Sequence, residues 1–341
     1  MNQFFYNVLG GINNIVGSWG VAMIIFTILI RLVLTPFDYK SRVSMRKTQK
    51  LAPMQQALQK KYANDKDKLN QKMAELYKKE HINPLSSCLP MLLTWPILII
   101  IFGAMRTAAN EQLLNQLTQM LRGQEPTLEP FLWIKNLWMP DNVFSPAYAD
   151  LGTLKGVATD QWVKWFQNLQ SSAEGLPPIL QQLGLTEASF EKGALAQTVE
   201  SIVGALQGTR EGFAGFAFYR DAIKTIPGYT IPLVGWSVPH LPNGWLLLPL
   251  LSGASQIVMT KITTANQPQQ PAANGQPNTG KFMQWFFPIF SVVICLGYSA
   301  IFALYWVTGN LVSMVQTVII NKMLDKKEQM AAPVAGEGSV K

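Results

Sequence analysis

Arg31 is the charged residue that lies deepest within an apolar run of this chain. Residues 19–37 contain no other Asp, Glu, Lys or Arg. A charge at membrane depth costs roughly 2.5–3.5 kcal/mol on insertion scales, so it needs a partner. None of the apolar runs contains an Asp or Glu. The remaining partners are water, carbonyls, hydroxyls, an acidic group that arrives from outside, or lipid headgroups reached by snorkelling along the helix.

Polar side chains recur at helical spacing in the same run and in three others. Thr27 and Thr35 flank Arg31 at intervals of four residues, so all three share one helix face. The other polar positions are Ser252, Ser255, Gln256, Gln284, Ser291, Trp306, Asn310, Ser313 and Thr317. Such stripes either join helices through hydrogen bonds or line a space that holds water. Together with Arg31 they predict a hydrophilic groove that carries a positive charge.

Residues for covalent or metal chemistry are scarce in this sequence. His81 and His240 are far apart and have no motif around them, and Cys88 and Cys295 stand within apolar runs. Neither a metal site nor a disulfide framework is expected from such a pattern, and there is no P-loop pattern for a nucleotide. The sequence therefore predicts no catalytic residues, no enzyme activity, no cofactor and no metal.

The composition places most of the chain in a bilayer. Of its 341 residues, 48% are apolar and 14% charged, against about 25% charged in an average soluble protein. Runs long enough to cross about 30 Å of hydrocarbon predict five spans at 19–37, 85–105, 241–262, 282–298 and 299–323. We therefore expect an all-α polytopic membrane protein with a five-transmembrane-helix core, a cytoplasmic helical hairpin and a helical outer loop region.

The segments between the spans predict the orientation of the chain. Residues 38–84 carry twelve Lys or Arg and five Asp or Glu, so they are expected in the cytoplasm. The N-terminus is then outside, and five crossings leave the C-terminus in the cytoplasm. Two apolar patterns in 38–84 predict an antiparallel helical hairpin with a turn at Asn64 and Asp65, and Asp65 or Asp67 as the helix cap. Pro53 is expected to bend its first arm.

Four further segments have distinct compositions. Residues 1–18 contain no Lys or Arg, so we expect no conventional cleavable signal and predict an outer, interfacial amphipathic helix. Residues 106–240 form an extracytoplasmic loop region, in which Trp162, Trp165 and Phe166 build either a local core or a surface on lipid headgroups. Residues 263–281 are expected to be a cytoplasmic disordered linker, and residues 324–341 a cytoplasmic tail.

Several motifs, in a fixed order, resemble the YidC-type insertases of the YidC/Oxa/Albino superfamily. They are "FTILIRLVLTPFDYK", "HINPLSSCLPMLLTWP", "FLWIKNLWMPDN", "NGWLLLPLLSGASQ" and "LGYSAIFALYWVTGN". The resemblance covers roughly residues 1–142 and 241–325. Within the family, the chain is similar to the shorter Gram-positive-type members. Residues 143–240 exceed the minimal pattern of that family.

The resemblance implies a bacterial plasma-membrane insertase and chaperone that inserts newly made membrane proteins without nucleotide hydrolysis. It implies a groove open to the cytoplasm, with Arg31, Thr27, Gln256 and Trp306 as substrate-groove residues. The polar face of the last span adds Asn310 and Ser313 to this set. Implied partners are nascent proteins with hydrophobic segments, the ribosome or signal-recognition machinery through the 40–81 hairpin, the Sec translocon and the lipid bilayer. A membrane-complex assembly chaperone without active insertion is the alternative. A small-solute transporter is a further alternative, although transporters usually show inverted repeats or acid pairs.

Overall fold

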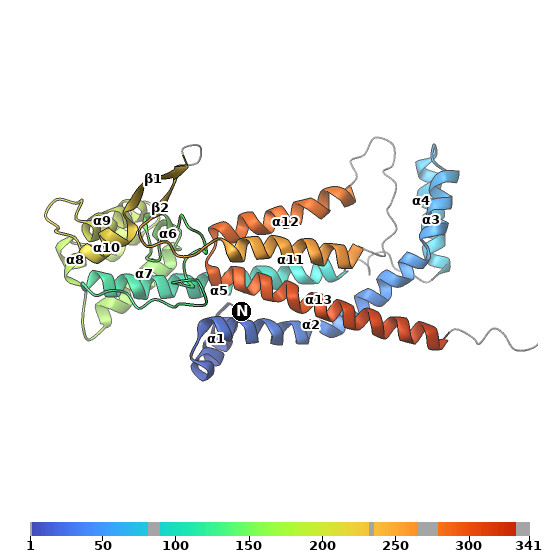
Figure 1. Cartoon of the computed structure of the whole chain (residues 1–341), viewed down its shortest axis with the longest axis horizontal. Coiled ribbons are helices and arrows are strands. Elements are labelled where there is room, and N and C mark those ends of the chain that lie inside the picture. Colours follow the sequence, from blue (N-terminus) through green and yellow to red (C-terminus); the bar gives the residue numbers. More distant parts are fainter. Residues whose placement is uncertain (1, 81–88, 232–234, 265–278, 332–341) are drawn as a thin grey trace, which may run out of the picture. The chain divides into compact units, whose positions relative to one another are not determined.

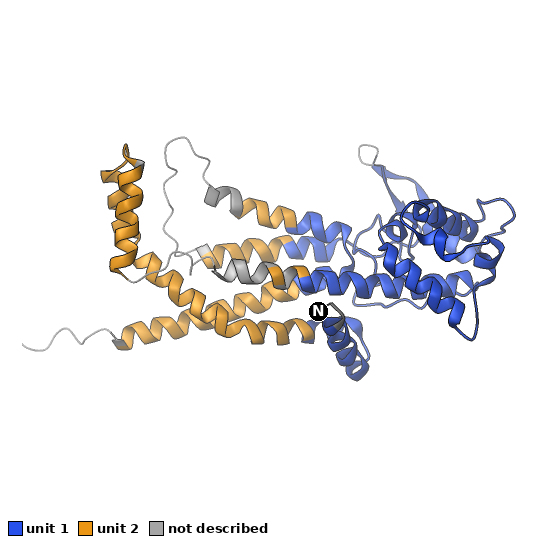
Figure 2. Cartoon of the chain, turned by 180° about the vertical axis from the view of Figure 1, so that it is seen from behind, with its two compact units in different colours: residues 1–25, 100–252, 291–306 blue, residues 26–99, 253–290, 307–341 orange. Residues whose placement is uncertain are grey.

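A computed structural model describes residues 2–80, 89–231, 235–264 and 279–331 of the chain (Figure 1). Most of these residues are helical, as the sequence predicts. They divide into two compact units (Figure 2). Unit 1 contains Met1–Ile25, Ile100–Ser252 and Ser291–Trp306, and unit 2 contains Phe26–Ile99, Gly253–Phe290 and Val307–Lys341.

The long helices contribute residues to both units. They are α2 (Trp19–Lys50), α5 (Leu89–Leu121), α11 (Leu247–Thr264), α12 (Thr279–Gly297) and α13 (Ala300–Ala331). Several extend past the predicted spans, because the amphipathic segments beside the spans continue the same helices. Among the described residues, Trp19–Lys50 and Ala300–Met330 are long and apolar enough to cross a membrane, and Gln284–Gly297 is a shorter apolar helix.

Unit 1 contains the N-terminal helix and the region between the second and third predicted spans. Its shorter elements are α1 (Asn2–Val16), α6 (Leu151–Lys155), α7 (Thr159–Ser171), α8 (Pro178–Gln182), α9 (Leu195–Gln207) and α10 (Ala217–Ile223). Tyr6 of α1 lies beside Glu111 of α5, and burial together with this neighbouring carboxylate raises the pKa of Tyr6 to about 12.

An aromatic cluster forms the local core of the loop region. Trp162, Trp165 and Phe166 of α7 are buried and pack around Phe190, with ring centroids 4.9–6.0 Å apart. The sequence left a core and a headgroup-facing surface open for these residues, and the structure places them in a core. Such a cluster stabilises a fold through burial of large apolar area.

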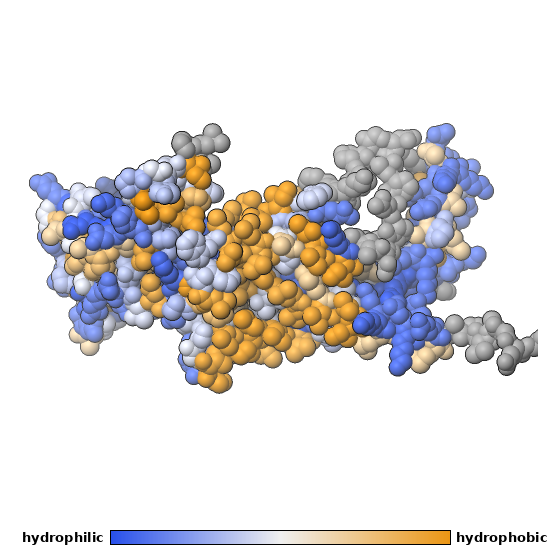
Figure 3. Space-filling model, viewed as in Figure 1, coloured by the Kyte–Doolittle hydropathy of each residue, from blue (hydrophilic) through white to orange (hydrophobic). Residues whose placement is uncertain are grey.

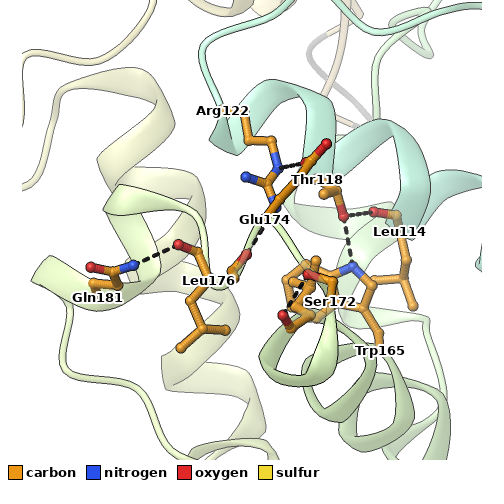
Figure 4. A network of polar contacts seen from close by, with 10 residues as sticks. Leu114, Thr118, Arg122, Trp165, Ser172, Glu174, Leu176 and Gln181 are labelled. Carbon is orange, nitrogen blue, oxygen red and sulfur yellow. Dashed lines mark hydrogen bonds and ion pairs between the residues drawn. The ribbon is translucent and has the colours of Figure 1, made fainter.

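Polar contacts join this core to the end of α5 (Figure 4). The Trp165 indole Nε1 donates a hydrogen bond to Thr118 Oγ1 at 2.9 Å. Arg122 forms an ion pair with Glu174 at 3.2 Å and donates to the Gly175 carbonyl at 2.8 Å. These bonds therefore hold the loop after α7 against the end of α5, the helix that contains most of the second predicted span.

A two-stranded antiparallel sheet is the one departure from an all-α fold in the described part of the chain. It consists of β1 (Thr225–Ile231) and β2 (Trp236–Pro239), with Ile231 paired to Trp236. The loop region that the sequence predicts as helical is mostly helical but also contains this sheet. The segment is rich in Thr, Ile, Tyr and Val, which favour strands. Gly228 has a φ of 83° within β1, where the register of the strands shifts, and Gly235 has a φ of 67° just before β2.

In unit 2, the basic segment forms two short helices that contact each other, α3 (Ala52–Lys61) and α4 (Lys66–Lys79). Asp65 caps α4, because its side chain accepts a hydrogen bond from Lys68 N at 3.0 Å, so this cap prediction is confirmed. The first arm of the hairpin is interrupted between α2 and α3, where Pro53 lies in the first turn of α3. Most of the predicted linker 263–281 lies outside the described residues, as do residues 332–341 of the predicted tail.

Candidate functional site

The Arg31 guanidinium group lies against Gly309 of α13. A Cβ atom built at Gly309 would be 3.1 Å from Arg31 Nη2 and 3.5 Å from Nε. The side chain of Arg31 is only partly buried. A glycine inside an apolar helix usually marks a close approach, and here the approaching group is the cation. Gly309 therefore provides the space that Arg31 occupies within unit 2.

Gln316 of α13 binds the same turn of α2. Its Nε2 donates to the Arg31 carbonyl at 3.0 Å and to Thr35 Oγ1 at 2.7 Å, while Thr35 Oγ1 also donates to the Arg31 carbonyl at 2.9 Å. Gln316 Oε1 and the nearby Ser313 Oγ are buried and have no hydrogen-bond partner within the protein. Buried polar atoms of this kind usually bind water.

Further basic residues of α2 contact the end of α13. Arg42 Nη2 donates to Thr317 Oγ1. Arg46 donates to the Asn321 carbonyl at 2.9 Å and pairs with Asp325 at 2.7 Å, and Lys50 pairs with Glu328 at 3.2 Å. We call these contacts of α2 with α13, from Arg31 to Lys50 and from Gly309 to Glu328, the α2–α13 seam. Residue numbers rise together along both helices, so their paired segments run parallel.

Asp38 adds a negative charge beside the seam. It lies within electrostatic range of both Arg31 and Arg42, and it follows Arg31 by seven residues, or about two helical turns. No Asp or Glu lies within the apolar run of Arg31, and Asp38 adds an acidic group just outside that run. Asp38 was not considered from the sequence because this residue stands one position beyond the predicted end of the span.

The remaining predicted groove residues fall in both units. Asn310 donates to Ser255 Oγ of α11 at 3.0 Å, so it joins two helices of unit 2. Thr27 is fully buried, Gln256 is partly exposed and Ser313 is buried in that unit. Trp306 belongs to unit 1, where its ring packs 5.7 Å from that of Phe302. Unit 2 thus brings together five of the six predicted residues, and Gly309, Gln316 and Asp38 are additions that the sequence reasoning missed.

The Asn and Asp residues in the motifs "FLWIKNLWMPDN" and "NGWLLLPLL" meet within unit 1. Asn243 Nδ2 donates to the carbonyls of Asn136, Met139 and Pro140 at 2.9–3.1 Å, and its Oδ1 accepts from Asn136 N at 2.8 Å. Asp141 accepts from Trp245 N and Leu248 N at 2.9 and 2.7 Å and so caps α11. These contacts fix the start of a long helix, which is a structural role.

Unit 2 therefore presents a partly buried cation, an acidic neighbour, unpaired buried polar atoms and hydroxyls on long helices. Metal-ligand clusters are absent from the part of the chain that the structure describes. This combination, on helices of which two are long and apolar enough to cross a membrane, is typical of a helical membrane protein with a polar seam between two of its helices.

Comparison with known proteins assigns the chain to a family. The sequence model of the 60Kd inner membrane protein family matches residues 11–186 and 213–328. The chain therefore belongs to this family, and the resemblance to the YidC/Oxa/Albino superfamily is confirmed.

Three relatives share the name Membrane protein insertase YidC. The protein of Anaeromyxobacter dehalogenans (strain 2CP-C) is 39% identical over 137 residues, which cover 40% of this chain and 22% of the relative. That of Fusobacterium nucleatum is 42% identical over 107 residues, which cover 31% and 52%. That of Francisella tularensis subsp. novicida is 38% identical over 144 residues, which cover 42% and 23%. The chain spans about half or less of the length of these relatives.

Proposed function

We propose that this chain is a membrane protein insertase that passes newly made proteins into the bilayer through a hydrophilic groove open to the cytoplasm. The Arg31 guanidinium, placed on Gly309 and only partly buried, is the observation that carries this proposal. The name shared by the relatives supports it. Thr27, Gln256, Asn310 and Ser313 are proposed to line the groove, with Trp306 as the aromatic residue that touches substrate.

Water in the groove would be the medium in which Arg31 acts. The unpaired Ser313 Oγ and Gln316 Oε1 support the presence of water, because a buried polar atom without a partner costs about 1–3 kcal/mol. Hydration also lowers the cost of storing a guanidinium at membrane depth, which would otherwise be several kcal/mol. A wet recess therefore explains the charge better than dry helix packing does.

The mechanism needs no covalent step. An incoming protein with a short acidic tail is attracted by Arg31, which shortens the low-dielectric path that the tail must cross. Its apolar segment then enters lipid, driven by burial of about 25 cal/mol per Å² of apolar surface. The membrane potential adds roughly 2.3 kcal/mol per charge per 100 mV for an acidic tail that moves outward. No nucleotide is required for this sequence of events.

The proposed orientation puts the basic segment 38–84 and the end of α13 in the cytoplasm. The parallel pairing of α2 with α13, through Arg46 with Asp325 and Lys50 with Glu328, supports it, because two parallel helices end on the same side of a membrane. The helical hairpin at 40–81 would then face arriving ribosomes or signal-recognition machinery, and the Sec translocon is a further proposed partner.

A cross-linking experiment separates insertion from later assembly. A photoreactive amino acid at Gln256, and in a second variant at Ser313, is expected to cross-link the apolar segment of a ribosome-stalled nascent chain. The same probe at the exposed Lys192 of unit 1 is the control and should give no product. Cross-links at Gln256 and Ser313 that form only after release from the ribosome would favour an assembly chaperone and contradict active insertion.

A further inference from the structure

The β1–β2 hairpin presents an uncharged, apolar surface to the solvent side of unit 1. The side chains of Tyr229, Ile231 and Trp236 are 66%, 43% and 45% exposed. Residues 225–239 contain no Asp, Glu, Lys or Arg. Several exposed large apolar side chains on one uncharged segment are unusual on a surface that faces only water.

The base of this hairpin is held firmly within unit 1. His240 N donates to the Lys224 carbonyl at 2.9 Å, and Leu241 N donates to the Ala222 carbonyl at 3.2 Å. The Trp236 ring also packs against Phe144 with centroids 5.2 Å apart. The exposed side chains therefore have a fixed direction, which is a requirement for a binding surface.

The apolar surface of the hairpin continues toward a long membrane helix. The chain leads from β2 to the start of α11, where Trp245, Leu250 and Leu251 are 63%, 58% and 45% exposed. Figure 3 shows apolar residues on the hairpin and on the nearby ends of the long helices of unit 1. The exposed apolar residues of a membrane-spanning helix face lipid, and the start of α11 follows β2 directly in the order of elements.

We propose that the β1–β2 hairpin lies on the bilayer and places Tyr229, Ile231 and Trp236 among the lipid headgroups and the upper acyl chains. Trp and Tyr are enriched at this depth, because each combines an apolar ring with a polar tip. The absence of charge makes the contact independent of anionic lipid. In the proposed orientation the leaflet is the outer one. This inference does not rest on insertase activity.

Fluorescence quenching in lipid nanodiscs tests the proposal with the full chain. In a background of Cys88→Ser and Cys295→Ala, a bimane probe is attached to Tyr229→Cys, or to Ile231→Cys as a second variant. Phosphatidylcholine with a spin label high on the acyl chain is the quencher. The probe at Lys192→Cys, an exposed position of the same unit, is the matched control.

We expect quenching at Tyr229 and Ile231 to exceed that at Lys192 by about twofold or more. The result should be the same with and without phosphatidylglycerol. Quenching at both hairpin positions no stronger than at Lys192 would overturn the proposal, and so would quenching that appears only with the anionic lipid. All three substituted positions are exposed, so each labelled variant is expected to fold. Circular dichroism of each variant checks this.

Discussion

Replacing Arg31 with Ala is expected to lower the insertion of small proteins with acidic tails by about tenfold, which corresponds to about 1.4 kcal/mol of lost attraction. Opposite charges about 4 Å apart interact by about 4 kcal/mol at an effective dielectric of 20, and water in the groove reduces this value. Insertion is measured by protease protection of the translocated tail in proteoliposomes. Proteins whose tails lack acidic residues should be affected less.

Two variants separate the charge from other effects of the substitution. Arg31→Lys keeps a cation at the same position and should retain most of the insertion. Arg210→Ala removes one positive charge from an exposed site of unit 1, where Arg210 donates to Ser201, and should change nothing. Equal insertion of acidic-tailed proteins by the Arg31→Ala variant and the unaltered chain would remove the central role of Arg31.

The second large effect is expected from Gly309→Leu. A Cβ atom at this position already lies 3.1 Å from Arg31 Nη2, so the branched side chain must displace the guanidinium. Insertion of acidic-tailed proteins should fall nearly as far as with Arg31→Ala, although Arg31 itself is intact. The helix itself should tolerate the change, because Leu is a better helix former than Gly. The same protease-protection assay measures the loss.

Graded and matched glycine substitutions make this result specific. Gly309→Ala should give a smaller loss, because the far end of the flexible Arg31 side chain can move by the few tenths of an ångström required. Gly297→Leu is the control, since a Cβ atom there meets nothing within 4 Å. If Gly309→Leu inserted substrate as well as Gly297→Leu does, the space at Gly309 would be irrelevant to function.

Local spacing allowed the sequence to place the candidate polar residues of unit 2 on shared helix faces, and their role as groove residues stays a prediction. Thr27, Arg31 and Thr35 share a face through the helical period alone, and the same period aligns Asn310, Ser313 and Thr317. Helical spacing could not identify Gln316 as the partner of Thr35, since that contact joins residues 281 positions apart. Gly309 carries no side chain, so its role depends wholly on what approaches it.

The spacing of residues could not determine where the helices end or which distant residues pack together. Asp38 was assigned to the cytoplasmic hairpin, yet it lies within electrostatic range of Arg31, because α2 continues to Lys50. The pattern of Trp162 and Phe166 fits either a core or a membrane surface, and only the position of Phe190 decides it. The strands β1 and β2 were missed because they are short and because Gly228 interrupts the apolar pattern of β1.

Thiol labelling tests directly whether water reaches the proposed groove on the face of Arg31. In a background of Cys88→Ser and Cys295→Ala, single cysteines replace Gln256 and, two residues along the same helix, the exposed apolar Val258. A membrane-impermeant maleimide reacts with the thiolate, which forms only in contact with water. The account predicts labelling of Gln256→Cys from the cytoplasmic side and none of Val258→Cys. An unlabelled Gln256→Cys in a folded, reconstituted protein would contradict it.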